Sequence, residues 1–357
     1  MKRICQRCNV ISQDFNLWCQ EIYCPAENAT EIFGNGEWFG PIEIIDTLVV
    51  TRSAIIYHAA RGVEEILLKV ANLGCEEKLR SEALAFLQLA KSGQHPLLPV
   101  LLPAHQQGSI EKHPYGWTVI NGKLKYYEVF KYVDGSILRN LLLTNPQPWF
   151  QHAGWIVLSI ADVVYYLHKS GRLHLCLNPG VVLVRYDKKG NPRPMLLDLG
   201  VGKPDKNLSE IWNANFNLPA YTAPEIAAGA GVVSPATDVY GLGMLLYEML
   251  AGRPAVEYHL QRDEAVLRKV LEGKFKPTGR VDLKNIPEAT EKAINREPAQ
   301  RFPDVLAFVR ALQPNFPVIP AEAKPRKINW RLIFIILGTL LAISLLLLLA
   351  FASIPQG

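Results

Sequence analysis

The sequence predicts an α+β fold in which a small β-rich part precedes a larger helical part. Residues 43–70 contain three runs of β-branched and apolar residues separated by short polar turns, a pattern typical of strands. From about residue 150 onward, apolar residues recur at helical spacing in long runs. The 357-residue chain is 49% hydrophobic, which is ample for a buried core in each part.

The individual elements follow in chain order. We expect strands over "IEIIDTLVV", "AIIYHAA" and "EEILLKVA", because each run is short, apolar and β-branched. A helix is expected over "EEKLRSEALAFLQLAKSG", with Gly93 near its end as a stop signal. Later helices are expected over "HAGWIVLSIADVVYYLHKSG", "ATDVYGLGMLLYEMLAG" and "DVLAFVRAL", each of which is amphipathic or wholly apolar.

The C-terminal region predicts a membrane anchor. Residues 332–352 form a stretch of 21 residues without a charge, and as a helix they would be about 31 Å long, enough to cross a bilayer. A buried core helix is the alternative, but core helices rarely lack a polar stripe over such a length. The preceding residues 314–331 form a Pro-rich basic linker, and basic residues stay cytoplasmic. We therefore expect a single-pass membrane protein with the N-terminal bulk of the chain in the cytoplasm.

Four of the six cysteines fall in the first 24 residues, as Cys5, Cys8, Cys19 and Cys24. Two close thiol pairs can complete a tetrahedral S4 shell around a structural zinc ion. The alternative is a set of unliganded thiols or a disulfide pair. Residues 1–33 resemble a small zinc ribbon, and metal binding would supply folding energy to a segment too short for its own core.

The charge pattern argues against nucleic acid as a partner. The whole chain carries a net charge of only +5, and residues 1–31 contain three basic and four acidic residues. A phosphate-binding surface needs a clear excess of positive charge. We expect a structural or protein-contact role for the cysteine-rich segment.

Seven motifs then occur in the order found in eukaryotic-type Ser/Thr protein kinases, and the chain resembles that family over residues 41–313. "ILLKV" is similar to the strand with the phosphate-binding lysine (Lys69), "RSEALAFL" to the helix with its glutamate partner (Glu82), and "LLDLGVGK" to the metal-binding segment (Asp198). The remaining motifs are "YEVFKYVDGSILRNLL", "YLHKSGRLHLCLNP", "YTAPE" with "ATDVYGLGMLLYEMLAGRPA", and "PAQRFPDVLAFVRAL".

The resemblance implies a two-lobe fold, with an N-lobe at about residues 41–133 and a C-lobe at about 134–313. It also implies architectural roles for three residues. Glu225 and Arg301 resemble the family's buried ion pair, and Asp238 resembles the aspartate that holds the backbone of the catalytic loop.

The residues that would perform phosphoryl transfer depart from the family pattern. Cys176 stands at the position of the catalytic aspartate and Val181 at that of the metal-binding asparagine, so no catalytic set is intact. Val49, Thr51 and Ala54 stand where the phosphate loop has glycines, so side chains replace the open backbone that approaches phosphate. The environment of Cys176 predicts a buried, inert thiol and not a nucleophile.

The predicted adenine pocket also departs from the family. Leu67 stands where the family usually has alanine, and Phe130 narrows the rear of the pocket. Ile56 and Leu183 match the remaining apolar walls. We expect these side chains to fill the space of the purine.

The nucleotide-binding residues of the family are retained in part, as Lys69, Glu82 and Asp198. Two interpretations stay open for the Lys69–Glu82 pair and two for Asp198. Lys69 and Glu82 can hold nucleotide phosphates or only pin the helix to the sheet. Asp198 can hold one magnesium ion or cap the turn at Gly200.

We predict a membrane-anchored pseudokinase that acts as a signalling scaffold, with a protein partner, structural zinc, and doubtful use of ATP and magnesium. The alternatives are a weakly active or atypical ATP-dependent Ser/Thr protein kinase and a nucleotide-sensing switch without turnover.

Overall fold

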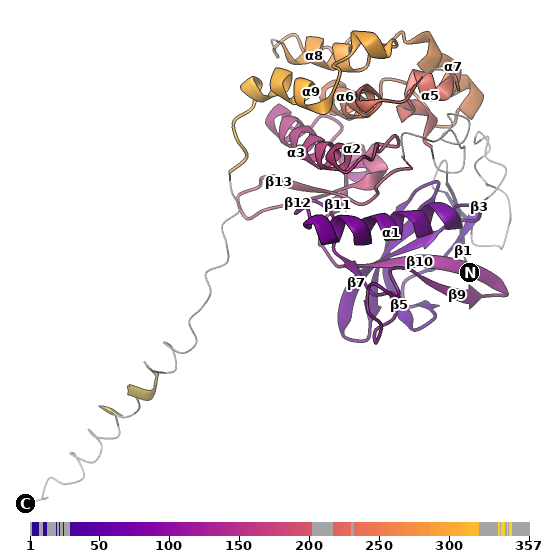
Figure 1. Cartoon of the computed structure of the whole chain (residues 1–357), viewed down its shortest axis with the longest axis vertical. Helices are drawn as coiled ribbons and strands as arrows, with labels where there is room; N and C mark the ends of the chain where they lie inside the picture. The colour runs from indigo at the N-terminus through magenta and orange to yellow at the C-terminus, as the bar shows by residue number, and fades with distance from the viewer. Residues whose placement is uncertain are drawn as a thin grey trace, which may run out of the picture. The chain divides into compact units, whose positions relative to one another are not determined.

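The computed structural model divides into two units, Met1–Ile319 and Pro320–Gly357 (Figure 1). The structure describes residues 2–6, 10–12, 29–201, 217–229, 232–283 and 285–320, together with residues 19, 21, 24, 335, 337–339, 341, 343 and 344. All elements below belong to the first unit.

The N-lobe is built on an antiparallel sheet. Its strands are β4 (Trp38–Phe39), β5 (Ile42–Val50), β6 (Ala54–Arg61), β7 (Glu64–Ala71), β8 (Leu101–Leu102), β9 (Gly116–Ile120) and β10 (Lys123–Lys131). They run in the order β4-β5-β6-β7-β10-β8, and β9 pairs with β10. The three strands expected from residues 43–70 are confirmed as β5, β6 and β7. β7 lies inside the sheet, between β6 and β10, and this position explains why its residues from Ile66 to Ala71 are buried.

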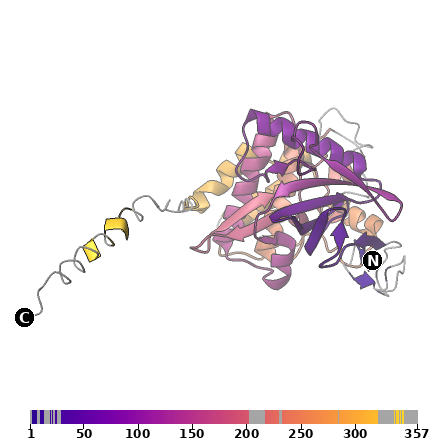
Figure 2. The same cartoon turned by 90° about the horizontal axis from the view of Figure 1, so that it is seen from below.

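Helix α1 (Glu76–Ser92) lies across this sheet, as Figures 1 and 2 show. Its buried face contains Leu79, Glu82, Ala83 and Phe86, at the three- and four-residue spacing of a single helix face. The helix ends before Gly93, as the sequence predicted. Glu82 is a charged residue on this buried face, so it needs a partner inside the protein.

The N-terminal segment forms a small sheet of β1 (Lys2–Cys5), β2 (Ile11–Ser12) and β3 (Ala29–Ile32), in the order β2-β1-β3. Its Ile4 and Ile32 are buried in the same apolar cluster as Phe39 and Tyr57 of the N-lobe. The segment therefore shares a core with the N-lobe. Apolar packing against the N-lobe therefore contributes to the folding of this segment, in addition to the metal binding expected from the sequence.

The C-lobe is mainly helical. It contains α2 (Leu138–Thr144), α3 (Phe150–Lys169), α5 (Pro224–Ala227), α6 (Pro235–Ala251), α7 (Asp263–Glu272), α8 (Ile286–Ala293) and α9 (Val305–Leu312). A small sheet of β11 (Ser136–Ile137), β12 (Val182–Tyr186) and β13 (Pro192–Leu196) completes it. The α+β, two-lobe fold expected from the sequence is thus confirmed.

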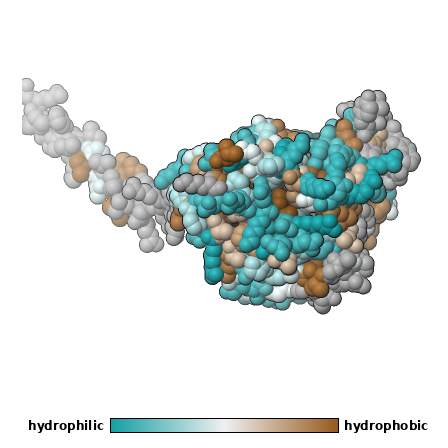
Figure 3. Space-filling view, turned by 90° about the horizontal axis from the view of Figure 1, so that it is seen from above, coloured by the Kyte–Doolittle hydropathy of each residue, from teal (hydrophilic) through white to brown (hydrophobic). Residues whose placement is uncertain are grey.

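Helix α6 is the central element of the C-lobe, because every residue from Ala236 to Leu250 is buried. Ser234 and Thr237 form a capping box at its start. A Cβ atom at Gly243 would lie 2.7 Å from Ala293 Cβ, so glycine allows α8 to pack closely on α6. The outer face of the lobe seen in Figure 3 is largely hydrophilic, as expected for solvated helix surfaces.

The C-lobe continues past residue 313, where the linker was expected to begin. Phe316 is buried in the main core, and Trp155 Nε1 donates to the carbonyl oxygen of Pro317 at 2.7 Å. The residues that link to the second unit therefore start later than predicted. Within the described part of the chain, no helix has the length and apolar character to span a bilayer. Most of the predicted anchor, residues 332–352, lies outside the described residues.

A buried ion pair fixes α5 against the end of the C-lobe. Arg301 Nη1 and Nη2 donate to Glu225 Oε1 and Oε2 at 2.8 and 2.7 Å, and Arg301 Nη1 also donates to the carbonyl oxygen of Ala236 at 3.1 Å. Two parallel bonds of this kind have the fork geometry that only arginine offers to a carboxylate.

Replacing Arg301 with methionine should lower the free energy of unfolding by about 3–5 kcal/mol, because Glu225 would stay buried without a counter-charge. Urea unfolding would measure the change. Arg310→Met, on the exposed face of α9, is the matched control and should change the stability by less than about 0.5 kcal/mol. Equal effects of the two substitutions would contradict this account of the ion pair.

Candidate functional site

The structure brings Lys69, Glu82 and Asp198 together between the lobes. Lys69 Nζ lies 2.8 Å from both Glu82 carboxylate oxygens and 2.9 Å from Asp198 Oδ2. Lys69 comes from β7, Glu82 from the buried face of α1, and Asp198 from the segment after β13. All three side chains are almost fully buried, so each charge depends on the others for neutralisation.

A second lysine, which the sequence analysis did not single out, joins this cluster. Lys78 Nζ lies 3.1 and 2.8 Å from Asp198 Oδ1 and Oδ2, and 3.5 Å from Glu82 Oε2. Lys78 precedes Glu82 by four residues on α1, so both side chains project from one face of the helix. This spacing is the signal in the sequence that could have identified it.

The pKa values of the cluster follow from its charges. Burial alone would raise the pKa of Asp198, but Lys69 and Lys78 outweigh it and hold that pKa well below its usual range. Burial alone would lower the pKa of Lys78, but Asp198 and Glu82 raise it above its usual value. Two ammonium groups therefore face two carboxylates, and the cluster is neutral without a ligand.

Glu128 is a third carboxyl group beside this cluster. It pairs with Lys69 across β10 and β7, so the two side chains share one face of the sheet. It is fully buried, and within the described chain neither of its carboxyl oxygens has a hydrogen-bond partner. Burial and the nearby Glu82 carboxylate raise the pKa of Glu128 well above its usual value.

The loop that resembles a catalytic loop keeps its backbone frame. Asp238, on α6, accepts hydrogen bonds from the backbone amides of His174 and Leu175 at 2.8 and 2.7 Å. Asp238 also lies 2.8 Å from His168 Nε2. Leu175 has a positive φ of 66°, a strained conformation that these bonds hold in place.

The chemistry of the same loop differs from the family pattern. Cys176 is buried, and burial raises the pKa of its thiol far above the usual value, so it is not a thiolate at neutral pH. Val181 is also buried, and its side chain has no atom that could bind a metal ion. Neither position carries a group able to serve as a general base or a magnesium ligand.

The four apolar residues expected to line an adenine pocket lie in the protein core. Ile56, Leu67, Phe130 and Leu183 are all buried in one apolar cluster. Phe130 also packs edge-on against Phe86, with ring centroids 5.1 Å apart. These side chains therefore contribute to the main core.

Little room remains where nucleotide phosphates would lie. The free volume there is about 30 Å³, whereas sites for small molecules usually measure about 300–1,000 Å³. The residues around it include Gln6, Thr51, Arg52, Lys78, Arg139, Cys176, Val181 and Asp198. The residues present therefore do not fit a nucleotide with its magnesium ions.

Polar contacts also hold the loop between β5 and β6 against the C-lobe. Arg52 donates two hydrogen bonds to the Asp263 carboxylate on α7, at 2.7 and 2.8 Å. Arg139, on α2, donates to the carbonyl oxygen of Val50 at 3.2 Å. Sequence analysis missed these contacts, because no motif relates residues so far apart in the chain.

Three of the predicted metal ligands lie together. The sulfur atoms of Cys5, Cys19 and Cys24 all lie within 4.8 Å of one another, and those of Cys5 and Cys24 are 3.7 Å apart. A tetrahedral zinc site with Zn–S bonds of about 2.3 Å has sulfur atoms roughly 3.8 Å apart, so the spacing fits zinc. Cys8, the fourth predicted ligand, lies outside the described residues.

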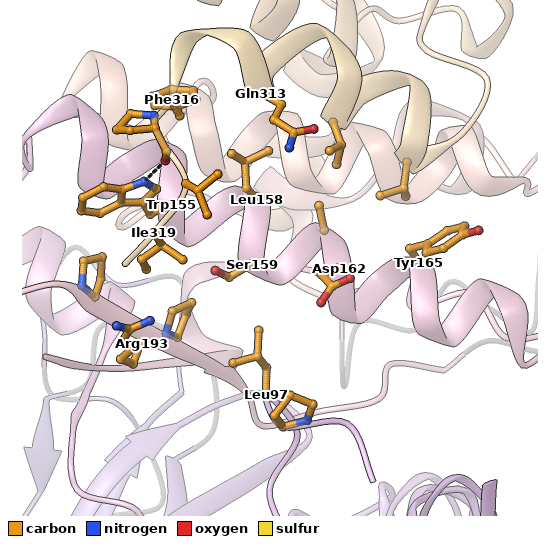
Figure 4. Close-up of a pocket in the computed structure, with 18 of the residues that line it drawn as sticks. Leu97, Trp155, Leu158, Ser159, Asp162, Tyr165, Arg193, Gln313, Phe316 and Ile319 are labelled. Carbon is orange, nitrogen blue, oxygen red and sulfur yellow. Dashed lines mark hydrogen bonds between the residues drawn. The ribbon is translucent and has the colours of Figure 1, made fainter. Parts of the chain in front are cut away.

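A separate groove of about 430 Å³ lies between α3, β13 and the segment that follows α9 (Figure 4). Leu97, Leu158 and Ile319 contribute to its apolar lining. Its charged residues, Asp162 and Arg193, already contact His95 and Asp187 at 3.3 and 2.7 Å. The groove offers no arrangement of groups suited to catalysis.

His174 is buried at the junction between the lobes, and both of its ring nitrogens have backbone partners. Its Nε2 lies 3.0 Å from the carbonyl oxygen of Asp198, and its Nδ1 accepts from the amide of Cys176 at 3.2 Å, so the ring is neutral with the proton on Nε2. Burial lowers the pKa of His174 below its usual value.

We expect the free energy of unfolding to fall as the pH drops below about 6.5, by up to about 1.4 kcal/mol per pH unit, because the unfolded chain then binds a proton that folded His174 refuses. Urea unfolding of wild type and His174→Gln between pH 7.5 and 5 would measure this slope, which the substitution should reduce. His259→Gln, at an exposed position, should leave the slope unchanged. A slope unaltered in His174→Gln would assign the acid sensitivity to other groups.

Comparison with known proteins agrees with this architecture. The chain is 36% identical over 137 residues to the serine/threonine-protein kinase PkaA of Streptomyces coelicolor, covering 38% of this chain and 25% of that protein. It is 29% identical over 204 residues to the serine/threonine-protein kinase PknK of Mycobacterium tuberculosis, covering 54% of this chain and 18% of that protein. The chain thus spans a quarter or less of the length of these relatives.

A solved structure of the Mycobacterium tuberculosis PknI kinase domain superposes with a TM-score of 0.52 at 20% identity, covering 80% of this chain and all of that domain. At this identity the likeness concerns the fold alone. The family model of the protein kinase domain matches residues 113–302, more than half of the chain. The chain therefore belongs to the protein kinase domain family.

Proposed function

We propose that this chain is a pseudokinase, which uses its kinase fold for regulated contact with a protein partner and not for efficient phosphoryl transfer. One observation carries the proposal: Lys78 and Lys69 already neutralise Asp198 and Glu82 in the place where a nucleotide and its metal would bind. A charge cluster that is complete in itself has no electrostatic need for ATP and magnesium.

The missing chemical groups support the same proposal. Phosphoryl transfer requires a group that accepts the substrate hydroxyl proton and groups that hold metal ions. Cys176 and Val181 occupy the two positions and supply neither. Loss of a general base typically costs a factor of about 10²–10⁴ in rate.

A weakly active protein kinase is the second candidate, and it is favoured by the retained Lys69–Glu82 pair and by the likeness to Ser/Thr kinases. A nucleotide-sensing switch is the third, and it requires the purine space to open. Leu67 and Phe130 argue against it, because both belong to the buried core. The two alternatives differ in whether turnover follows binding.

The proposal also includes a structural zinc ion on the N-terminal cysteines and a membrane anchor. The close sulfur atoms of Cys5, Cys19 and Cys24 support the zinc ion. The uncharged residues 332–352 support an anchor that would hold the kinase-like lobes at the cytoplasmic face of a membrane. A partner in or near that membrane follows from this placement.

Thermal unfolding of the full chain in detergent, with and without ATP and magnesium, tests the proposal. A true ligand at a hundredfold excess over its Kd would stabilise the protein by about 2.7 kcal/mol, and we expect no such stabilisation. Phosphate transfer to a generic protein substrate should also stay at background. Magnesium-dependent transfer that disappears in Lys69→Met but persists in Lys91→Met, at an exposed position of α1, would establish the weakly active kinase instead.

Elemental analysis of the purified chain should find about one zinc ion per molecule, since four thiolates form a complete tetrahedral shell. Cys24→Ser should lose most of this zinc. Cys75→Ser, which changes a buried thiol outside the cluster, should retain it. Zinc-free wild type, or full zinc content in Cys24→Ser, would refute the site.

A further inference from the structure

The divalent metal position at Asp198 contains a side chain of the protein itself. In the family that the chain belongs to, this aspartate holds a metal ion, and a metal ion would bind between or beside its two oxygens. Here the Lys78 ammonium lies 2.8 and 3.1 Å from the two oxygens. Asp198 Oδ1 also accepts from the amide of Gly200 at 2.7 Å, and Oδ2 contacts Lys69 Nζ at 2.9 Å.

The surroundings favour a single positive charge at this point over a double one. Val181 has no side-chain oxygen to act as a second ligand, and the nearby Glu82 carboxylate already contacts both Lys69 and Lys78. Magnesium and manganese prefer several oxygen ligands and retain water. The space beside Lys78 measures only about 30 Å³, which leaves little room for a hydrated ion.

Lys78 is also held in place from its own helix. Its side chain is 9% exposed, and its Nζ lies 3.5 Å from Oε2 of Glu82, one turn further along α1. Glu82 in turn accepts from the amide of Leu199, next to Asp198, at 2.9 Å. Movement of the ammonium would leave two buried carboxylates with one counter-charge, which is costly.

We infer that Lys78 is a tethered cation that replaces the divalent metal at Asp198, so that the two lobes are joined without metal and the cleft excludes magnesium and manganese. The inference deepens the proposed function, on which it rests, because it names the group that excludes the metal. It predicts that removing the ammonium creates metal affinity. If Lys78 had a purely structural role, removing its ammonium would lower the stability of the protein without any gain of metal binding.

The test uses the full chain loaded with zinc and free of nucleotide, and follows Mn²⁺ binding by electron paramagnetic resonance. Wild type should take up no Mn²⁺ at Asp198. Lys78→Met, which keeps an unbranched side chain of similar length, should bind Mn²⁺ at least roughly tenfold more tightly than wild type. The double variant Lys78→Met/Asp198→Asn should lose this gain, and Lys91→Met on the same helix should behave as wild type.

Two results would overturn the inference: Mn²⁺ binding by wild type that Asp198→Asn abolishes, or a folded Lys78→Met without gained affinity. If Lys78→Met does not fold, Lys78→Gln provides a second uncharged variant. The comparison of wild type with Asp198→Asn tests the inference without any change at Lys78. Wild type that transfers phosphate would refute the proposed function. Inactive wild type with manganese at Asp198 would refute only the tethered cation.

Discussion

The cluster of Lys69, Lys78, Glu82 and Asp198 is the interaction on which the arrangement of the lobes depends. It connects β7 and α1, which are neighbours in the sequence, to the distant segment after β13. Four charges taken out of water cost several kcal/mol each unless they neutralise one another. The cluster therefore fixes α1 against both lobes, and it does so with groups that belong entirely to the chain.

The loop around His174 shows that the architecture of the fold can be separated from its chemistry. Asp238 binds the backbone of His174 and Leu175, and these bonds do not depend on the side chain at position 176. A Cβ atom at Gly200 would lie 1.8 Å from the carbonyl oxygen of His174, so glycine is required where the two segments meet. Replacement of an acidic side chain by a cysteine thus leaves the frame of the loop intact.

Packing and electrostatics both limit what the cleft between the lobes has room and charge to bind. Leu67 and Phe130 belong to the buried apolar core, and Lys78 contacts the Asp198 carboxylate. The Arg52–Asp263 contact holds the loop between β5 and β6 down on α7. A ligand would have to disrupt all of these interactions together, and this is the physical basis for proposing a role in contact and not in turnover.

The sequence by itself determined the strands of residues 43–70, the helix after them, and the identities of Lys69, Glu82 and Asp198, because local periodicity and short motifs encode these features. It also showed which chemical groups are missing, since Cys176 and Val181 are read directly from the motif. Only the tertiary structure decided that Lys78 neutralises Asp198, 120 positions away, and that Arg52 contacts Asp263, 211 positions away. Such pairings depend on how the lobes pack and on the direction of each side chain, which no local pattern records.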